Sequence, residues 1–337
     1  QKSATSLLLK HKSIKFPKVA KKHSGKIMNA HNTTECLKTT YSDGHRYNIH
    51  SLDVSKYDDF FLSADDLTVN MWRYENSRIS YRILDKTPSD MSNLRFVITR
   101  AKFKKNDSNT VIVGLNNGVT KSYDLRSRSQ ADSGLCQVFR PSIKDEDKHS
   151  SQYGDVINSI HDFDTTSDGR YLVTRDYLTV KVWDMRFTER PTRIHRVHDY
   201  VKPMLPMLNE TDNIYDTFDV CISPCDSYVI SGSYGARFHT FNLHSSKCHE
   251  NSLYDTNQMF DSLSNLSAMD GFVINEPVNQ FNASATNWFS KAARHYCFNK
   301  MHNTLTVADA ASLFLHDYKI CAVDGKHRKS TVQRVPI

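Results

Sequence analysis

Five stretches of the chain repeat one arrangement of apolar and polar residues, and this arrangement predicts a β-hairpin. In each, a turn residue precedes a run rich in Val, Ile, Leu, Phe or Tyr. Turn-forming residues follow, and a second run then alternates apolar and polar residues. The stretches are 57–75, 109–126, 169–186, 226–244 and 303–318. The first run is typical of a strand covered on both faces, and the alternating run is typical of a strand with one buried face and one wet face.

The alternating runs predict which side chains face the core. Val180 and Val182 flank Lys181, and Asn70 likewise lies between two apolar residues. We therefore expect Asn70 and Lys181 on the wet face. The turns between the runs are rich in Asp, Asn and Gly, which suit tight connections between strands.

Four of the five alternating runs end at an aromatic residue. These residues are Trp72, Tyr123, Trp183 and Phe241, and the fifth run has His316 at the same place. We expect Trp72, Trp183 and Phe241 to belong to the core, because large aromatic side chains at a repeated strand position contribute most of the buried area.

Successive closing positions lie 51, 60, 58 and 75 residues apart, which exceeds the roughly 40–45 residues of a plain WD repeat. Another short apolar run precedes most hairpins, and three to four strands per unit is typical of a propeller blade. The extra residues fall in the polar stretches 126–155 and 244–290. The first could equally be a binding loop or a tolerated insertion, whereas the Asn- and Ser-rich second stretch favours an insertion.

The predicted fold is therefore all-β, a WD-repeat β-propeller with five recognisable blades. We assign 1–36 to a basic N-terminal arm, which includes a remnant of an early-blade region, 37–320 to the propeller and 321–337 to a C-terminal tail. The predicted blades are approximately 43–82, 94–126, 155–187, 213–245 and 288–318.

Three motifs in these units resemble a known family. SADDLTVNMW (63–72), TRDYLTVKVWDM (174–185) and VHDY (197–200) are similar to stretches of the 55-kDa regulatory B subunits of protein phosphatase type 2A. The resemblance covers about residues 37–320 and is most specific at 167–200. That family has a seven-bladed propeller, so the resemblance implies that its first two blades would precede residue 1.

The resemblance implies a subunit without chemistry of its own, which holds a phosphoprotein substrate beside the phosphatase catalytic subunit. Its substrate groove lies on the face around the central opening. The matching positions here are Asp65, Asp66, Leu94, Val97, Tyr153, Tyr177 and Tyr234. The aspartates could alternatively just make a turn, and Leu94 and Val97 could pack a strand. The three tyrosines are expected at turns or loop ends on the same face, where each would supply buried area and a polar tip at an interface.

The chain carries a formal net charge of +7, and the position of that charge indicates which partners are plausible. Residues 1–34 hold eight lysines and no acidic residue, and the remaining chain is almost neutral. The arm could be a solvated segment or could dock onto an acidic partner, and it offers the one route to nucleic acid. Contact with the family's scaffold subunit involves the early blades and a projecting hairpin, to which residues 12–30 could correspond.

Enzyme and metal motifs are missing from the sequence. It has no G-x-S-x-G, no P-loop and no G-x-G-x-x-G. Cys221 and Cys225 have no second cysteine pair with which to bind zinc, and His195, His198 and Asp199 are interpreted as structural hydrogen-bonding groups. We therefore expect no catalytic residue, no metal and no cofactor.

The cellular setting follows from the cysteines and the apolar runs. Seven scattered cysteines without a signal-peptide core predict reduced thiols in the cytoplasm, with the nucleus also open. The sequence contains no run of 18 apolar residues, so it predicts no membrane-spanning helix. A rival interpretation keeps the propeller as a structural member of a larger protein or ribonucleoprotein assembly, docked through the lysine arm.

Overall fold

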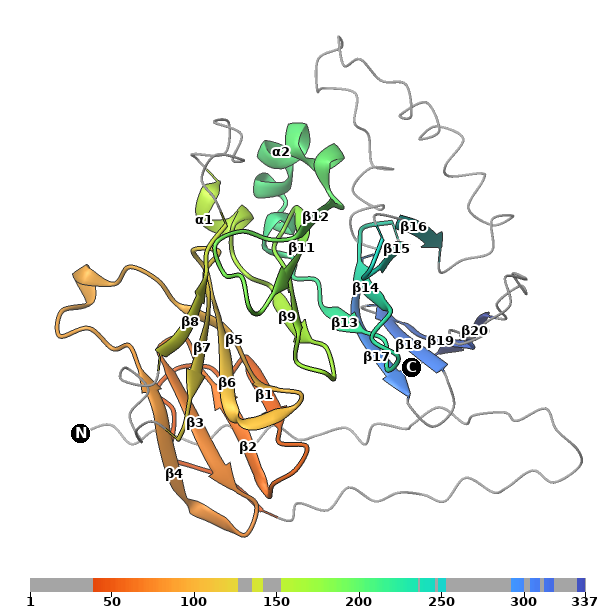
Figure 1. Cartoon of the computed structure of the whole chain (residues 1–337). Helices are drawn as coiled ribbons and strands as arrows, with labels where there is room; N and C mark the ends of the chain where they lie inside the picture. The colour runs from red at the N-terminus through yellow and green to blue at the C-terminus, as the bar shows by residue number, and fades with distance from the viewer. Residues whose placement is uncertain are drawn as a thin grey trace, which may run out of the picture.

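Antiparallel sheets make up nearly all of the regular structure. The computed structural model describes residues 39–126, 135–141, 153–235, 237–245, 248–252, 292–299, 304–309, 312–317 and 332–336. Within these ranges, twenty strands form five four-stranded sheets, and in every sheet the strands follow chain order. Figure 1 shows the sheets in succession from orange to blue.

The strands are short, and a few helical turns lie in the connections between sheets. The strands are β1 (Ser51–Val54), β2 (Phe60–Ala64), β3 (Thr68–Arg73), β4 (Asn76–Asp85), β5 (Ile98–Lys104), β6 (Asp107–Leu115), β7 (Thr120–Asp124), β8 (Leu135–Phe139), β9 (Asp162–Thr165), β10 (Tyr171–Arg175), β11 (Thr179–Asp184), β12 (Arg193–Arg196), β13 (Val220–Ile222), β14 (Tyr228–Gly232), β15 (Arg237–Asn242), β16 (Cys248–Ser252), β17 (Ala293–Asn299), β18 (Thr304–Asp309), β19 (Ser312–Asp317) and β20 (Val332–Pro336). The helices are η1 (Met91–Asn93), α1 (Gly154–Ile157), η4 (Asp199–Met204), α2 (Leu205–Glu210) and η5 (Asn213–Tyr215). None of the helices in the described ranges is long and apolar enough to cross a membrane.

The sheets are arranged as the blades of a propeller. The first strand of each sheet contacts the first strand of the next, in the order β1, β5, β9, β13 and β17. These first strands therefore lie innermost, and each sheet leads outward to its fourth strand. The expectation of an all-β, WD-repeat propeller is confirmed, with five blades in the described residues.

Each blade adds a fourth strand beyond the predicted hairpin. β8 lies inside the polar stretch 126–155, β16 lies inside 244–290, and β20 pairs with β19 through Phe314 and Arg334. The two polar stretches are therefore partly strand and not wholly connections between blades. The pattern did not reveal these strands because outer strands pair on one side only and need few apolar residues.

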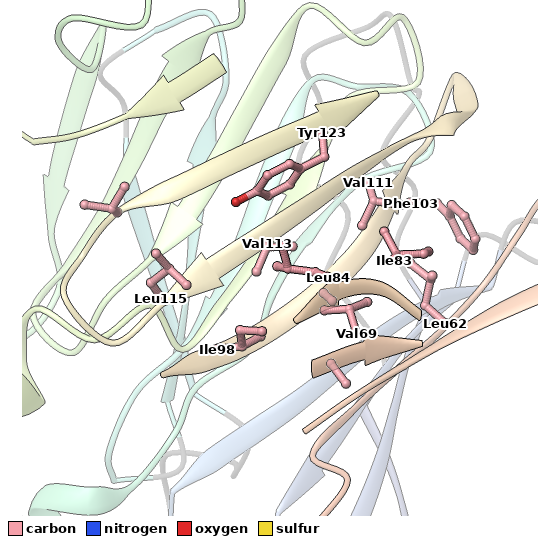
Figure 2. Packing of buried hydrophobic residues seen from close by; sticks show 13 residues of the cluster. Leu62, Val69, Ile83, Leu84, Ile98, Phe103, Val111, Val113, Leu115 and Tyr123 are labelled. Atoms are coloured by element: carbon pink, nitrogen blue, oxygen red, sulfur yellow. The ribbon is translucent and has the colours of Figure 1, made fainter. Parts of the chain in front are cut away.

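Apolar side chains fill the space between neighbouring blades. Leu62 and Val69 of the first blade pack against Phe103, Val111 and Val113 of the second, as Figure 2 shows. Fully burying a side chain of this size contributes about 1.5–3 kcal/mol. The faces of the sheets that pack on each other therefore supply most of the cohesion between blades.

The predicted core aromatics are confirmed, whereas one predicted wet position is wrong. Trp72, Trp183 and Phe241 are buried. Asn70 is also buried, and its amide donates to Gly44 O at 2.5 Å. The reason is that the segment before β1 lies over this face of the first blade. Lys181 is half-buried.

Side chains connect the innermost strands in place of a backbone ladder. Asp53 Oδ2 accepts from Phe103 N at 2.7 Å, joining blades one and two. Asp164 Oδ2 accepts from Ile222 N at 2.8 Å, joining blades three and four. Between blades two and three, Lys102 donates to Phe163 O at 2.9 Å. Polar residues on these inner strands are therefore needed for the blades to join.

Arg100 extends this connection across four blades. Its Nη1 donates to His50 O at 2.7 Å and its Nε donates to His161 O at 2.9 Å. Its Nη2 lies 3.3 Å from Asp219 Oδ1 in the fourth blade. Because one guanidinium contacts blades one, three and four from blade two, these four blades share a common axis.

Candidate functional site

One end of the propeller gathers all the sequence-predicted site residues. The turns between second and third strands lie there beside the connections from one blade to the next. Ile98 N donates to Asp66 O at 2.8 Å, and Tyr177 N donates to Ile157 O at 3.2 Å. We call this end the turn rim, and Figure 1 shows α1 and α2 on it. The predicted residues lie on the β2–β3, β10–β11 and β14–β15 turns and on the connections that enter β5 and α1.

Asp65 is fully buried and forms the β2–β3 turn. Its Oδ1 accepts from Leu67 N at 2.9 Å and from Thr68 N at 2.6 Å. Its Oδ2 accepts from Thr68 Oγ1 and His45 Nδ1, both at 2.9 Å. Burial alone would raise the pKa of Asp65, but the hydrogen bonds from His45, Leu67 and Thr68 outweigh it and lower that pKa. All of its acceptor positions face inward, so this carboxylate is not presented to a partner.

A chain of hydrogen bonds continues from Asp65 into the blade. His45 Nε2 lies 2.5 Å from Ser63 Oγ, which in turn accepts from Trp72 Nε1 at 2.7 Å. The third blade repeats the outer part of this arrangement, since Trp183 Nε1 donates to Thr174 Oγ1 at 3.0 Å. The repetition assigns these residues to the fold of each blade.

Asp66, the next residue, is exposed on the turn rim. About half of its side chain, 49%, is open to solvent, and its Oδ1 lies 3.5 Å from His50 Nε2. Burial lowers the pKa of His50 despite the nearby carboxylate of Asp66. His50 is therefore mostly neutral at pH 7, and Asp66 offers an acidic group that no described cation fully neutralises.

Leu94 and Val97 lie beside Asp66 on the connection that enters the second blade. Leu94 is 38% exposed at the end of η1. Val97 is half-buried, and its backbone is held by Asn116 through bonds of 2.9 and 3.1 Å. The structure thus brings together an exposed carboxylate and an apolar ridge. Sequence reasoning missed Met91, which is half-exposed one turn before Leu94 and extends this ridge.

Tyr177 and Tyr234 converge, but in the interior. Their hydroxyls lie 2.9 Å apart, and Tyr234 also donates to Asn213 O at 2.9 Å. Both side chains are fully buried, and burial raises the pKa of each phenol. Tyr153 is half-buried against the same cluster. These hydroxyls hold the interior together and do not face a partner.

The roof over these tyrosines is the helical segment formed by η4, α2 and η5. Val201, Leu205 and Leu208 point into the cluster and are buried. Their spacing of four and three residues is helical, so the sequence did contain a signal for this roof. Sequence reasoning missed this helical segment because a propeller of strands alone was expected here.

His195, His198 and Cys225 each contact neighbouring groups of the fold. The ring of His195 lies against that of Phe241 in a tilted arrangement with centroids 4.5 Å apart, and His198 Nδ1 lies 2.8 Å from Tyr177 O. Cys225 Sγ lies 3.2 Å from a serine hydroxyl. Across the described ranges, no group of three or more His, Cys, Asp or Glu residues could hold a metal ion.

Comparison with known proteins finds a relative that matches more than half of the chain. Over 210 residues, 62% of this chain, the sequence is 35% identical to the "Protein phosphatase PP2A 55 kDa regulatory subunit" of Drosophila melanogaster. The match spans 42% of that protein, so the chain spans less than half the length of this relative. No family model matches the chain. Over this length the chain is therefore similar in sequence to a 55-kDa regulatory subunit of protein phosphatase PP2A, and its described residues form a five-bladed architecture.

Proposed function

We propose that this protein is a non-catalytic regulatory subunit of a type 2A serine/threonine phosphatase, which recruits phosphoprotein substrates. The observation that carries the proposal is the 35% identity over 210 residues to a protein named as such a subunit. The partners proposed with it are the catalytic subunit and the scaffold subunit. Holding a substrate close to the catalytic subunit raises its effective concentration without any new chemistry.

The turn rim of the first two blades is the proposed substrate contact. Asp66 can pair with basic residues that flank a phosphosite, and such an exposed pair contributes about 0.2–1 kcal/mol. Leu94 and Met91 can be covered by the apolar face of a short helix, and each fully buried side chain contributes about 1.5–3 kcal/mol. The apolar ridge therefore supplies most of the affinity, and Asp66 supplies the preference for basic substrates.

The first experiment tests assembly with purified phosphatase subunits. The full chain is mixed with scaffold and catalytic subunits at mild salt and analysed by size-exclusion chromatography. Co-elution in one peak is expected. Separate elution of the chain at micromolar concentrations would refute the role of regulatory subunit.

A second experiment tests the substrate surface in the assembled complex. Asp66→Lys should weaken binding of a basic phosphopeptide, and Leu94→Ser should weaken it further. Asp59→Lys makes the same charge change on an exposed residue of the β1–β2 turn, at the opposite end of the blade. If Asp59→Lys lowers the affinity as much as Asp66→Lys, net charge and not the turn rim selects the substrate.

A further inference from the structure

One position of the repeat has a small residue in four blades and an arginine in the third. It lies in the second strand of each blade, paired with the third-strand residue that comes three places before the closing residue. The residue at this position is Ala64, Gly114, Gly232 or Ala308 in four blades and Arg175 in the third.

At Gly114 packing requires the small residue. A Cβ added to Gly114 would lie 2.9 Å from Ile160 Cγ2, which belongs to the approach to the next blade. A propeller blade can therefore be built here with no side chain beyond a methyl group. Arg175 is not needed to form the blade, and its presence calls for another explanation.

The guanidinium of Arg175 is fully buried and largely unpartnered. Its Nη2 lies 3.2 Å from His198 Nδ1, and its Nε and Nη1 have no hydrogen-bond acceptor in the described structure. The ring of Phe218 lies 5.4 Å from the guanidinium carbon. Burial lowers the pKa of Arg175 to about 10, so the group remains charged at neutral pH.

The neighbouring carboxylate is already engaged. Asp176 Oδ1 accepts from Leu178 N at 2.9 Å and from Thr179 N at 2.6 Å. Its Oδ2 accepts from Thr179 Oγ1 at 2.7 Å and from Lys181 Nζ. Asp176 therefore serves the turn and Lys181, and although its charge also acts on Arg175, no carboxylate in the described ranges accepts a hydrogen bond from that guanidinium.

Two half-buried lysines of the innermost strand β5 and its turn do have an anion. Lys102 lies 2.5 Å from Asp162, and Lys105 lies 2.6 Å from Asp164. A buried charge without an ion partner is strongly unfavourable. A water molecule can accept a hydrogen bond from Nε, but it cannot neutralise the charge.

We propose that Arg175 is the binding group of an oxyanion site at the junction of the third and fourth blades, which takes a carboxylate or phosphate group. The planar guanidinium has free donors suited to the paired oxygens of such a group. His198 and Ser233 provide further polar atoms, with His198 Nε2 3.1 Å from Ser233 Oγ.

Tyr200 lies between solvent and the proposed Arg175 site. Its side chain is 41% exposed, and its hydroxyl lies 3.2 Å from Ser233 Oγ. A polar path therefore leads from Tyr200 through Ser233 and His198 to Arg175. Opening of the Tyr200–Ser233 contact admits the anion. This site does not depend on the substrate rim of the first two blades, so either proposal can fail alone.

The test is a titration of the full chain labelled with ¹⁵N-arginine. Inorganic phosphate or acetate is added at constant ionic strength, with chloride as the reference, and the Nε–H signals are followed by NMR. Arg175→Lys identifies the Arg175 signal by its disappearance. Arg193, whose guanidinium donates to Leu243 O and His244 O, serves as the internal control signal.

The expected result is a saturable shift of the Arg175 signal with no matching shift of Arg193. Movement with phosphate alone assigns the site to phosphoryl groups, movement with acetate alone assigns it to carboxylates, and movement with both assigns it to oxyanions in general. If neither anion moves the signal beyond the chloride reference, the proposal is overturned.

Thermal unfolding gives a second readout. The effective anion should raise the melting temperature of the wild-type protein and leave that of Arg175→Met unchanged. An equal rise in both proteins would place the anion elsewhere and overturn the site. If Arg175→Met does not fold, the titration still decides, because the Arg175 signal is assigned with the separate variant Arg175→Lys, which keeps the positive charge.

Discussion

Two adjacent aspartates on one turn have opposite surroundings, and substituting them separately tests the assignment of the turn rim. Asp65 is buried with four hydrogen-bond donors around its carboxylate, whereas Asp66 is half-exposed. Asp65→Asn keeps Oδ1 as an acceptor. It replaces Oδ2 by an amide nitrogen, which faces the donors of His45 and Thr68. The substitution therefore removes two hydrogen bonds to a charged group and places donors against donors.

The magnitude follows from those two bonds. Hydrogen bonds to a charged group contribute about 1.5–3 kcal/mol each, so losing two of them in Asp65→Asn should lower the free energy of unfolding by about 3–6 kcal/mol. Asp66→Asn should change it by less than about 0.5 kcal/mol, as is usual for an exposed residue. Each kcal/mol corresponds to roughly 2–4 °C in melting temperature.

Urea unfolding followed by tryptophan fluorescence measures the free energies of unfolding of the two variants, and Trp72 lies in the same hydrogen-bond chain as Asp65.

The pH dependence of the free energy of unfolding gives an independent check. Because the folded pKa of Asp65 is lowered, its contribution is present above the unfolded pKa of about 3.9 and is lost as pH falls through the folded pKa. Wild-type protein should therefore lose more stability than Asp65→Asn on going from pH 5 to pH 3. Equal stabilities of the two Asn variants would refute the assignment of Asp65 to the turn.

Three further predictions concern the roof, a turn and the central axis. Leu208→Ala should lower the free energy of unfolding by about 2–5 kcal/mol in urea melts, since it leaves a cavity under the helical roof, and a loss below 1 kcal/mol would mean that the roof is loosely packed. Gly169→Ala should cost about 1–2 kcal/mol because its φ is +69°, whereas the control Gly154→Ala in α1 should cost nothing; equal effects would refute the strain at Gly169. The hydrogen bond to Asp219 raises the pKa of His295, so its stabilisation is present below the unfolded pKa of about 6.5 and is lost as pH rises through the higher folded pKa. His295→Gln should remove that part of the pH dependence in thermal melts, and an unchanged profile would contradict it.

The repeat pattern predicted the blades well because its physical cause is local. Alternation and turn residues act over a few residues, and they placed Trp72, Trp183 and Phe241 correctly in the core. Burial of Asn70 was missed because its partner, Gly44, lies 26 residues upstream. Which face of a strand is wet depends on what lies over it, and the pattern within the strand does not contain that information.

The same limit explains the candidate site. The resemblance placed seven residues at one end of the propeller, and the structure does gather them there. Depth separates them, since Asp65, Tyr177 and Tyr234 are buried, whereas Leu94 is exposed and the Asp66 side chain is half-exposed. The helical roof buries the two tyrosines, and the apolar spacing of this roof could be recognised in the sequence. The long-range contact with His45 buries Asp65, and no signal for that contact is present in the sequence.

Comparison among the blades separates residues that build the fold from residues that have another task. A residue required by blade geometry recurs, as the aspartate and threonine of the β2–β3 turn recur in the β10–β11 turn. A residue that appears once, at a position where four other blades have Ala or Gly, is not explained by blade geometry. Arg175 is such a residue, and its buried guanidinium also has two donor nitrogens, Nε and Nη1, without an acceptor among the described residues. Because the repeat exception and the unpaired donors are independent observations on one side chain, they favour a ligand over an accident of packing.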